Sequence, residues 1–398
     1  MLLVKHWAAE MRFAFGIVSL FPGGGLQRDC VDVARRVRNL GHEVTIFTAR
    51  KSPEPFAGDL TVRVLAVERR SNHGRQCAFS DALREHTAGQ FDVVVGFDKL
   101  DGLDVLYCSD RSIRARATRN PLLYLFPRYR CYIELERSCF APHSATKILL
   151  VSEPQLDEYW TAWTTEPHRL ILLPPTLAPE RRRPEYRTDG TRQTWRASLG
   201  LSADDWIWIA VCVQPKTKGL DRVIRALRHF PDARLLIVGL REDEAKSTKI
   251  REAAERLRLA TRIHWLGHRE DIPELMAAAD LLVHPARYDT TGTVILEAIA
   301  NGLPVITTSS CGYARHVGQA DAGVVLTEPF QQSALIGALR TAHDPRRLAH
   351  WSRCGAEYGH QDSLCRGRWR AAQFIAAAGA QPLETDRPLP QQLARRSA

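Results

Sequence analysis

Short apolar runs alternate with amphipathic stretches along almost the whole of this 398-residue chain, in two separate series. Strands that alternate with helices form parallel sheets covered on both faces. Two such series predict an α/β protein with two doubly wound, Rossmann-like domains facing a central cleft. The runs with the clearest strand pattern are RFAFGIVSL (12–20), EVTIFTA (43–49), DVVVGF (92–97), WIWIAVCV (206–213), ARLLIVG (233–239) and DLLVHP (280–285).

The domain boundaries are predicted from changes in composition. The stretch 172–190 is rich in proline and charge, which is typical of a linker or long loop. A final helical pattern is followed by a tail that contains proline and glutamine and that we expect to be disordered. The predicted parts are an extension (1–10), an N-terminal domain (11–170), a C-terminal domain (171–362), a helix crossing back to the N-terminal domain (363–380) and the tail (381–398).

The chain is basic, with a formal net charge of +10, which suits nucleic acid, an anionic membrane surface or a phosphorylated substrate. No apolar run reaches the roughly 18 residues of a membrane-spanning helix, and the first apolar run is too short for a signal peptide. The nine cysteines include no Cys-x-x-Cys pair. They argue against a disulfide framework or a structural zinc site, and for a reducing cytosol.

The first candidate ligand site is FPGGGLQRD (21–29), which follows the first predicted strand. Its glycines, Gly24 and Gly25 among them, let a backbone approach a ligand closely, and the helix start offers free N–H groups to an anion. The spacing is not the dinucleotide fingerprint, because Arg28 stands where a third glycine is needed. The alternative interpretation is a plain flexible turn.

The second candidate, VQPKTKGLDR (213–222), follows the first strand of the second series and places Lys216 and Lys218 before a helix start at Gly219. Ammonium groups beside a helix N-terminus can bind a diphosphate and can replace a metal ion there. Two solvated surface lysines are the alternative interpretation.

The third candidate, HPARYDTTGTVILEA (284–298), carries an acid on either side of a predicted helix start. The N–H groups near Gly292 and Thr293 form an anion pocket, with Asp289 on the preceding loop. Helical side chains lean toward the N-terminus, so Glu297, in the second turn, can reach the ribose of a nucleotide bound there. The alternatives are a turn acid and an exposed helix glutamate.

The segment 111–137 interleaves arginines with aromatic residues. Such a segment binds nucleic acid, lies in an anionic membrane interface, or is a solvated helix face. Arg128 and Arg130 beside Tyr129 and Tyr132 favour an interface. Two isolated residues complete the candidates: Asp110 follows a predicted strand, and His73 lies in the polar stretch SNHGR.

Together and in this order, these stretches resemble the retaining GT-B glycosyltransferases of family 4, and more narrowly the lipopolysaccharide core glucosyltransferase I family of Gram-negative bacteria. The resemblance extends over most of residues 11–360 and is most distinctive in FPGGGLQRD and GFDKLDGLDV. It implies a monomeric enzyme on the cytoplasmic face of the inner membrane that moves glucose or a related hexose from a UDP-sugar to an inner-core heptose. It implies no metal, no cofactor and no nucleic-acid partner.

The resemblance also implies roles for individual residues. Lys218, with Lys216 beside it, matches the basic group on the diphosphate, Gly24 and Gly25 match the loop near the donor phosphates, and Glu297 matches the ribose-binding glutamate. Asp289 stands where the family usually has a glutamate near the transferred sugar, and this departure leaves the donor sugar open. Asp29 and Asp110 match acids lining the N-terminal-domain side, and Asp110 is expected to take part in catalysis with Lys218 and Asp289. Asp29 and His73 are expected on the acceptor side, and 111–137 matches the membrane-facing part. The remaining alternatives are a UDP-hexosamine transferase, a UDP-sugar epimerase and an inactive membrane- or RNA-binding protein.

Overall fold

The computed structural model describes residues 10–53 and 56–379, and the chain forms two compact units. Unit 1 runs to Pro175 and resumes at Arg366, and unit 2 comprises Thr176–Cys365. The boundary thus falls five residues after the predicted end of the N-terminal domain at 170. Except for Glu10, the predicted extension and tail lie outside the described residues.

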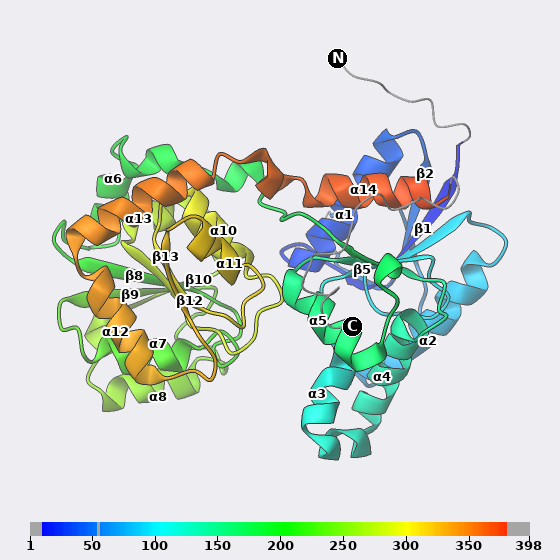
Figure 1. Ribbon diagram of the computed structural model, residues 1–398, viewed down its shortest axis with the longest axis horizontal. Coiled ribbons are helices and arrows are strands. Elements are labelled where there is room, and N and C mark those ends of the chain that lie inside the picture. The colour runs from blue at the N-terminus through cyan, green and yellow to red at the C-terminus, as the bar shows by residue number, and fades with distance from the viewer. Residues whose placement is uncertain (1–9, 54–55, 380–398) are drawn as a thin grey trace, which may run out of the picture. The chain divides into compact units, whose positions relative to one another are not determined.

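Unit 1 is built on a seven-stranded parallel sheet in the order β3-β2-β1-β4-β5-β6-β7 (Figure 1). The strands are β1 (Arg12–Leu20), β2 (Glu43–Lys51), β3 (Thr61–Val64), β4 (Val93–Gly96), β5 (Val105–Cys108), β6 (Lys147–Leu150) and β7 (Leu170–Leu172). Its helices are α1 (Gly25–Asn39), α2 (Asn72–Thr87), α3 (Ile113–Arg119), α4 (Pro127–Phe140), α5 (Glu153–Trp163) and α14 (Gly367–Ala378), with 3-10 turns η1 (Pro121–Leu125) and η2 (Pro167–Arg169).

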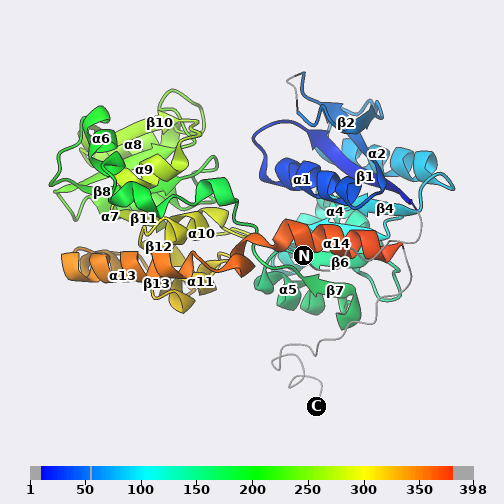
Figure 2. The ribbon, with the colours of Figure 1, turned by 90° about the horizontal axis from the view of Figure 1, so that it is seen from above.

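Helix α1 covers the sheet with the apolar stripe that its sequence predicts, since Cys30, Val31, Val33, Ala34 and Val37 are all buried. The C-terminal helix α14 packs against α1, as Figure 2 shows. Arg368 on α14 donates from Nε to Asp29 Oδ1 on α1 over 2.7 Å. The last described helix is therefore a structural part of unit 1.

Unit 2 is built on a six-stranded parallel sheet in the order β10-β9-β8-β11-β12-β13. The strands are β8 (Trp206–Val211), β9 (Ala233–Val238), β10 (Ile263–Gly267), β11 (Leu281–His284), β12 (Val305–Thr308) and β13 (Gly323–Leu326). The helices are α6 (Thr191–Ser198), α7 (Leu220–Leu227), α8 (Thr248–Arg256), α9 (Ile272–Ala278), α10 (Thr293–Ala300), α11 (Ala314–Gln319), α12 (Gln332–Ala342) and α13 (Pro345–Tyr358), with 3-10 turns η3 (Pro179–Arg181), η4 (Pro184–Arg187), η5 (Ala260–Arg262) and η6 (Asp362–Cys365). Two parallel α/β units confirm the predicted fold class.

The stretch 172–190 is more ordered than its proline-rich composition suggests. It contains η3 and η4, and most of it belongs to unit 2. Arg187 donates to the carbonyl oxygens of Met276 and Ala279 over 3.1 and 3.3 Å, and Asn301 donates to the Arg181 carbonyl over 2.7 Å. Of the two predicted alternatives, a linker or a long loop, the structure shows an ordered loop, because arginine and asparagine side chains bind this stretch to the body of unit 2.

One pair of cysteines departs from the expected reduced state. Cys77 on α2 and Cys131 on α4 form a disulfide bond, although their sequence separation is 54 residues. No local motif marks the pair, because the packing of α2 against α4 alone brings the two sulfur atoms together. The other seven cysteines are free.

Candidate functional site

The order of the strands locates the expected ligand edge of unit 2. The order β10-β9-β8 runs one way and β11-β12-β13 runs the other, so the direction of winding switches between β8 and β11. In open parallel sheets, ligands bind beyond the carboxyl ends of the strands at this point. The loop carrying Lys216 and Lys218 follows β8, and the loop carrying Asp289 follows β11. Two of the predicted segments therefore meet at one edge.

Backbone contacts hold these two loops together. The Arg287 N–H donates to the Thr217 carbonyl over 2.8 Å, and its guanidinium donates to the Lys216 carbonyl over 2.7 Å. Gly219 has φ +73°, and a Cβ there would lie 2.0 Å from the Pro285 carbonyl oxygen. Only glycine tolerates this approach, so the start of α7 is fixed against the end of β11.

Asp289 is the centre of a buried cluster of charged groups. Its Oδ2 atom lies 2.6 Å from Lys218 Nζ and 2.9 Å from His284 Nε2. His284 is only 2% exposed and Asp289 12%, so both groups are largely removed from water. The structure thus brings together two predicted site residues, Lys218 and Asp289. It adds His284, to which the sequence pattern assigns no role.

The cluster shifts the pKa values of its members in opposite directions. Burial lowers the pKa of His284, but its hydrogen bonds and charge interactions with Asp289 and Cys311 together outweigh burial and raise the pKa to about 9. Burial raises the pKa of Asp289, but His284 and Lys218 outweigh burial and lower it to about 2. A protonated histidine and a carboxylate are therefore the stable forms near neutral pH.

This ion pair predicts a pH-dependent stability of unit 2. The folded pKa of His284, about 9, exceeds its ordinary value of 6.5, so the stabilisation is complete below 6.5 and is lost as the pH rises through 9. The difference corresponds to about 3 kcal/mol in the free energy of unfolding. Urea unfolding followed from neutral to alkaline pH measures it. The His284→Gln variant should lose most of this dependence, and an unchanged pH dependence would contradict the assignment.

Helix α10 begins as its sequence predicts. Its N-cap, Gly292, has φ +73°, and the helix runs from Thr293 to Ala300. The preceding loop is held in place because the Gly312 N–H donates to the Asp289 carbonyl over 3.1 Å and the Tyr313 N–H donates to the Thr291 carbonyl over 2.7 Å. Glu297 is half-buried in the second turn. The free N–H groups of α10 and the Lys218 ammonium thus follow neighbouring strands, as an anion site requires.

One atom each of His284, Asp289 and Cys311 lie within 4.8 Å of one another, which is compatible with a metal site. The Lys218 ammonium is bound to the same Asp289 oxygen as His284, so two protonated groups already provide positive charge. Asp321, His350 and Cys354 form a second such group on the surface. The expected metal independence stays a prediction.

The glycine-rich loop of unit 1 lies at the corresponding edge of the other sheet. Gly24 is the N-cap of α1, and Gly25 is its first residue. A Cβ on Gly24 would lie 1.9 Å from Gln27 Oε1, while Gln27 donates to the Ser19 carbonyl over 3.1 Å. A side chain at position 24 would displace the end of the flexible Gln27 side chain, so the packing of Gln27 favours glycine there.

Two acceptor-side candidates have partners within unit 1. Besides its contact with Arg368, Asp29 accepts a hydrogen bond from the Tyr107 hydroxyl over 3.1 Å. His73 lies in the first turn of α2, 3.3 Å from the Ser71 hydroxyl and edge-on to the Tyr132 ring. These contacts give both residues a part in packing.

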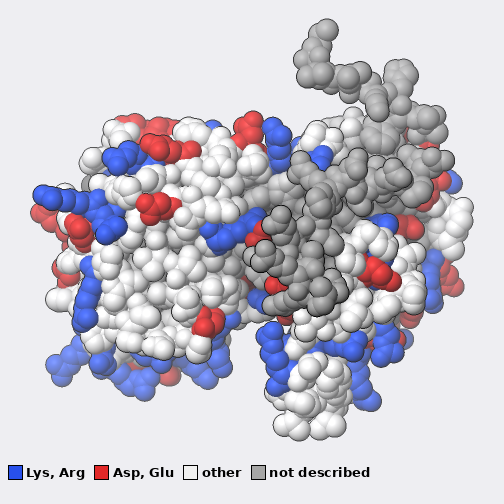
Figure 3. Space-filling view, viewed as in Figure 1, with Lys and Arg blue, Asp and Glu red and all other residues white. Residues whose placement is uncertain are grey.

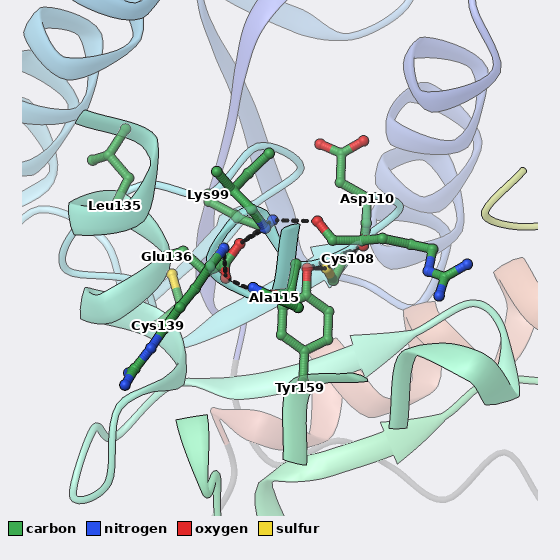
Figure 4. Close-up of polar contacts among 12 residues, drawn as sticks. Lys99, Cys108, Asp110, Ala115, Leu135, Glu136, Cys139 and Tyr159 are labelled. Carbon is green, nitrogen blue, oxygen red and sulfur yellow. Dashed lines mark hydrogen bonds and ion pairs between the residues drawn. The ribbon is translucent and has the colours of Figure 1, made fainter. Parts of the chain in front are cut away.

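Asp110 follows β5 and is exposed. Its carbonyl accepts from Gln155 Nε2 over 2.7 Å and from the Tyr159 hydroxyl over 3.1 Å. Figure 4 shows its carboxylate turned away from the polar contacts that Lys99 and Glu136 make underneath. The backbone of Asp110 is thus fixed by α5 while its side chain points out of the network.

Segment 111–137 folds into α3, η1 and α4, which project from unit 1 as a tip (Figure 1). The apolar residues Leu122, Leu125 and Phe126 are 67%, 74% and 55% exposed. Figure 3 shows a tip of uncharged surface flanked by lysine and arginine side chains. The rings of Tyr129 and Tyr132 are partly covered by Arg116 and Arg128. The exposed apolar surface therefore comes from η1 and its flank, which the sequence did not single out. Among the described residues, no helix is both long and apolar enough to cross a membrane.

Known protein families match most of the chain. Residues 24–176 match a family described as glycosyl transferase 4-like domain, and 191–355 match glycosyl transferases group 1. The lipopolysaccharide glucosyltransferase WaaG of Escherichia coli (strain K12) is 36% identical over 92% of this chain and 98% of its own length. The chain belongs to the lipopolysaccharide core glucosyltransferase I family. A crystal structure of WaaG covers 91% of the chain with a TM-score of 0.83 and 33% identity.

More distant relatives place this glycosyltransferase in a broader group. Mannosylfructose-phosphate synthase of Agrobacterium fabrum (strain C58) is 24% identical over 83% of this chain and 84% of its own length. Anabaena Alr3699/HepE, whose structure was solved with UDP and glucose, has a TM-score of 0.69 and 17% identity over 92% of this chain and 100% of that chain. At that identity the similarity concerns the GT-B fold alone.

Proposed function

We propose that the protein is a retaining glycosyltransferase that moves glucose from UDP-glucose to an inner-core heptose of lipopolysaccharide. The observation that carries the proposal is the Lys218–Asp289–His284 cluster beside the start of α10. The similarity to the lipopolysaccharide glucosyltransferase WaaG, which extends over nearly the full length of both chains, supports glucose as the transferred sugar and lipopolysaccharide as the acceptor.

The donor diphosphate would bind between the Lys218 ammonium and the first N–H groups of α10. As the glycosidic bond breaks, negative charge grows on the leaving UDP, and a fixed cation and helix N-terminus lower the energy of that charge. When the donor binds, the Lys218 ammonium would leave Asp289 and contact the donor phosphate. The protonated His284 would still neutralise the Asp289 carboxylate. Glu297, one turn further along α10, would accept hydrogen bonds from the ribose hydroxyls.

Retention of configuration follows if the acceptor hydroxyl attacks from the side that UDP leaves. The leaving phosphate can accept the proton of that hydroxyl, so no enzymic nucleophile is needed. Glycosidases instead use two carboxylates across the bond. In this proposal Asp289 binds the sugar end of the donor and does not attack it. Lys218 provides the positive charge, so no metal ion and no cofactor are needed.

A donor screen tests this proposal. Purified protein is offered UDP-glucose, UDP-galactose and UDP-N-acetylglucosamine, with and without a heptose-terminated core acceptor, and UDP release is measured. We expect the largest UDP release with UDP-glucose, and only with acceptor present. Preference for the hexosamine would contradict the donor, and donor isomerisation without acceptor would indicate an epimerase.

We also propose that the tip formed by α3, η1 and α4 binds the cytoplasmic face of the inner membrane. Apolar side chains rimmed by arginine suit an interface of anionic lipids. Leu125 and Phe126 would enter the headgroup region, while Arg116, Arg119, Arg128 and Arg130 lie near the lipid phosphates.

The double variant Leu125→Asp/Phe126→Asp should bind vesicles containing anionic phospholipid at least about tenfold more weakly, since burying each side chain contributes about 1.5–3 kcal/mol. Vesicle co-sedimentation measures the effect. Val64→Asp is the matched control, because Val64 is 51% exposed in unit 1 but lies on β3. Equal loss of binding in both variants would contradict a role for the tip.

A further inference from the structure

Asp98 lies at the point in unit 1 where the strand order reverses, between β1 and β4. It follows β4 by two residues, and its Oδ2 accepts the N–H of Val18 on β1 over 2.7 Å. Ligands of doubly wound sheets bind beyond the carboxyl ends of the strands at this reversal. The Asp98 carboxyl group therefore lies at the ligand edge of unit 1, joining its two central strands.

Two other aspartates beside strands of the same sheet also accept a backbone N–H, but they do not lie at the ligand edge. Asp92 Oδ2 accepts from the Arg12 N–H over 2.6 Å, and Asp104 Oδ2 accepts from the Val94 N–H over 2.7 Å. Both are exposed and lie at the amino ends of the strands. They illustrate what a purely structural carboxylate does in this sheet, and they provide matched controls.

The surroundings of Asp98 do not favour a charge. Its neighbour Lys99 directs its ammonium to Glu136 over 2.8 Å and to the Arg111 carbonyl over 3.1 Å. The Asp110 carboxylate beyond β5 and the buried Cys30 thiol on α1 are the other titratable groups near Asp98. Burial, with the Asp110 charge adding to it, outweighs the Val18 hydrogen bond and the Lys99 charge and raises the pKa of Asp98 to about 6. Within residues 10–53 and 56–379, Asp98 has no ion-pair partner within 4.0 Å.

An asparagine could also accept the hydrogen bond from the Val18 N–H, and it would avoid the cost of burying a charge. A carboxyl group whose charged form is destabilised, at the edge of the sheet where ligands bind, indicates a role in function. We propose that Asp98 binds a hydroxyl group of the acceptor sugar, on the same strand ends as Asp110. The inference rests on the proposed glycosyl transfer and names a residue for its acceptor side.

The chemistry suits a sugar. An ionised carboxylate accepts several hydrogen bonds, so one bond to Val18 leaves acceptor positions for a hydroxyl donor. Hydrogen bonds to charged groups are the stronger ones, and a protonated Asp98 would bind a hydroxyl group less well. Acceptor binding should therefore strengthen as the pH rises through about 6, the pKa of Asp98.

The Asp98→Asn variant tests the inference. Calorimetry with a heptose-terminated core oligosaccharide, without donor, should give about tenfold weaker binding than the wild type at neutral pH. The pH dependence of acceptor binding near pH 6 should disappear, and UDP affinity should stay unchanged. Thermal unfolding above the pKa of Asp98 should move a few degrees higher, because a desolvated charge has been removed. Asp104→Asn should leave acceptor binding unchanged.

Unchanged acceptor binding and an unchanged pH profile in Asp98→Asn would overturn the inference. So would a lower melting temperature with equal losses of acceptor and UDP binding, which is the pattern of a structural role. Absence of acceptor binding by the wild type would also overturn it. Acceptor binding without transfer from any UDP-sugar would overturn the proposed function and leave the role of Asp98 supported.

Discussion

Replacing Lys218 by alanine is expected to lower the transfer rate by about 100- to 1,000-fold, the usual effect of removing one group that stabilises a developing anion. Lys218 is the ammonium group that contacts Asp289, and it follows β8 directly before the start of α7. Its loss should also weaken UDP binding, because the diphosphate loses its fixed cation. Steady-state kinetics and UDP calorimetry on the same preparation measure both effects.

Lys216→Ala is the matched control. Lys216 is exposed on the same loop, and its backbone carbonyl accepts hydrogen bonds from Arg287 and from the Gly219 N–H. We expect its loss to change the rate only a few-fold. Equal effects of the two substitutions would mean that general positive charge attracts the donor. Unchanged UDP affinity in Lys218→Ala would contradict the assignment of the diphosphate to this residue.

The largest effect on stability is expected at Glu136, which is fully buried on α4. It accepts from Lys99 Nζ over 2.8 Å, from the Ser112 hydroxyl over 2.5 Å and from Trp163 Nε1 over 2.7 Å. Glu136→Ala should lower the free energy of unfolding by about 3–5 kcal/mol, because the Lys99 ammonium stays buried without its counter-ion.

The pH dependence of this contact has the opposite sign to that of His284. Burial raises the pKa of Glu136, but Lys99 and the hydrogen-bond donors outweigh burial, so the pKa lies below its ordinary value of 4.5. The stabilisation is therefore complete above 4.5 and is lost as the pH falls through the folded pKa. Loss of this contact should therefore contribute to the acid unfolding of unit 1.

Two further variants serve as controls for the predicted loss of stability in Glu136→Ala. Glu134 lies on the same helix, is 68% exposed and faces Arg137 at 3.6 Å, so Glu134→Ala should cost at most about 1 kcal/mol. The double variant Lys99→Met/Glu136→Leu should be more stable than Glu136→Ala, because no charge remains buried. Additive losses in the double variant would contradict a coupled ion pair.

The pattern of apolar residues and glycines in neighbouring positions predicted the strands and helices that position the site. The run 12–20 is β1 with the same bounds, and α10 begins directly after Gly292 as its glycine and apolar pattern indicate. Lys218 and Asp289 could be placed near one edge because they follow strands of one parallel sheet. These predictions succeed because strand and helix periods are written in neighbouring residues.

Long-range pairing could not be predicted in the same way. Glu136 lies in an arginine-rich segment, yet its partner, Lys99, is 37 residues away, and the Cys77–Cys131 bond spans 54 residues. Asp98 is an ordinary acid after a strand until the sheet order places it between β1 and β4. The tyrosines predicted to face a membrane are partly covered by arginine, because only the folded tip decides which apolar side chains stay exposed.

The most direct test of the proposed glucosyl transfer is the mass of the acceptor after incubation with purified protein and UDP-glucose. A heptose-terminated lipopolysaccharide core should gain the mass of one hexose and release an equal amount of UDP. The Lys218→Ala variant should add almost none in the same time. A core of unchanged mass with every UDP-sugar offered, from protein that binds UDP, would contradict glycosyl transfer to this acceptor.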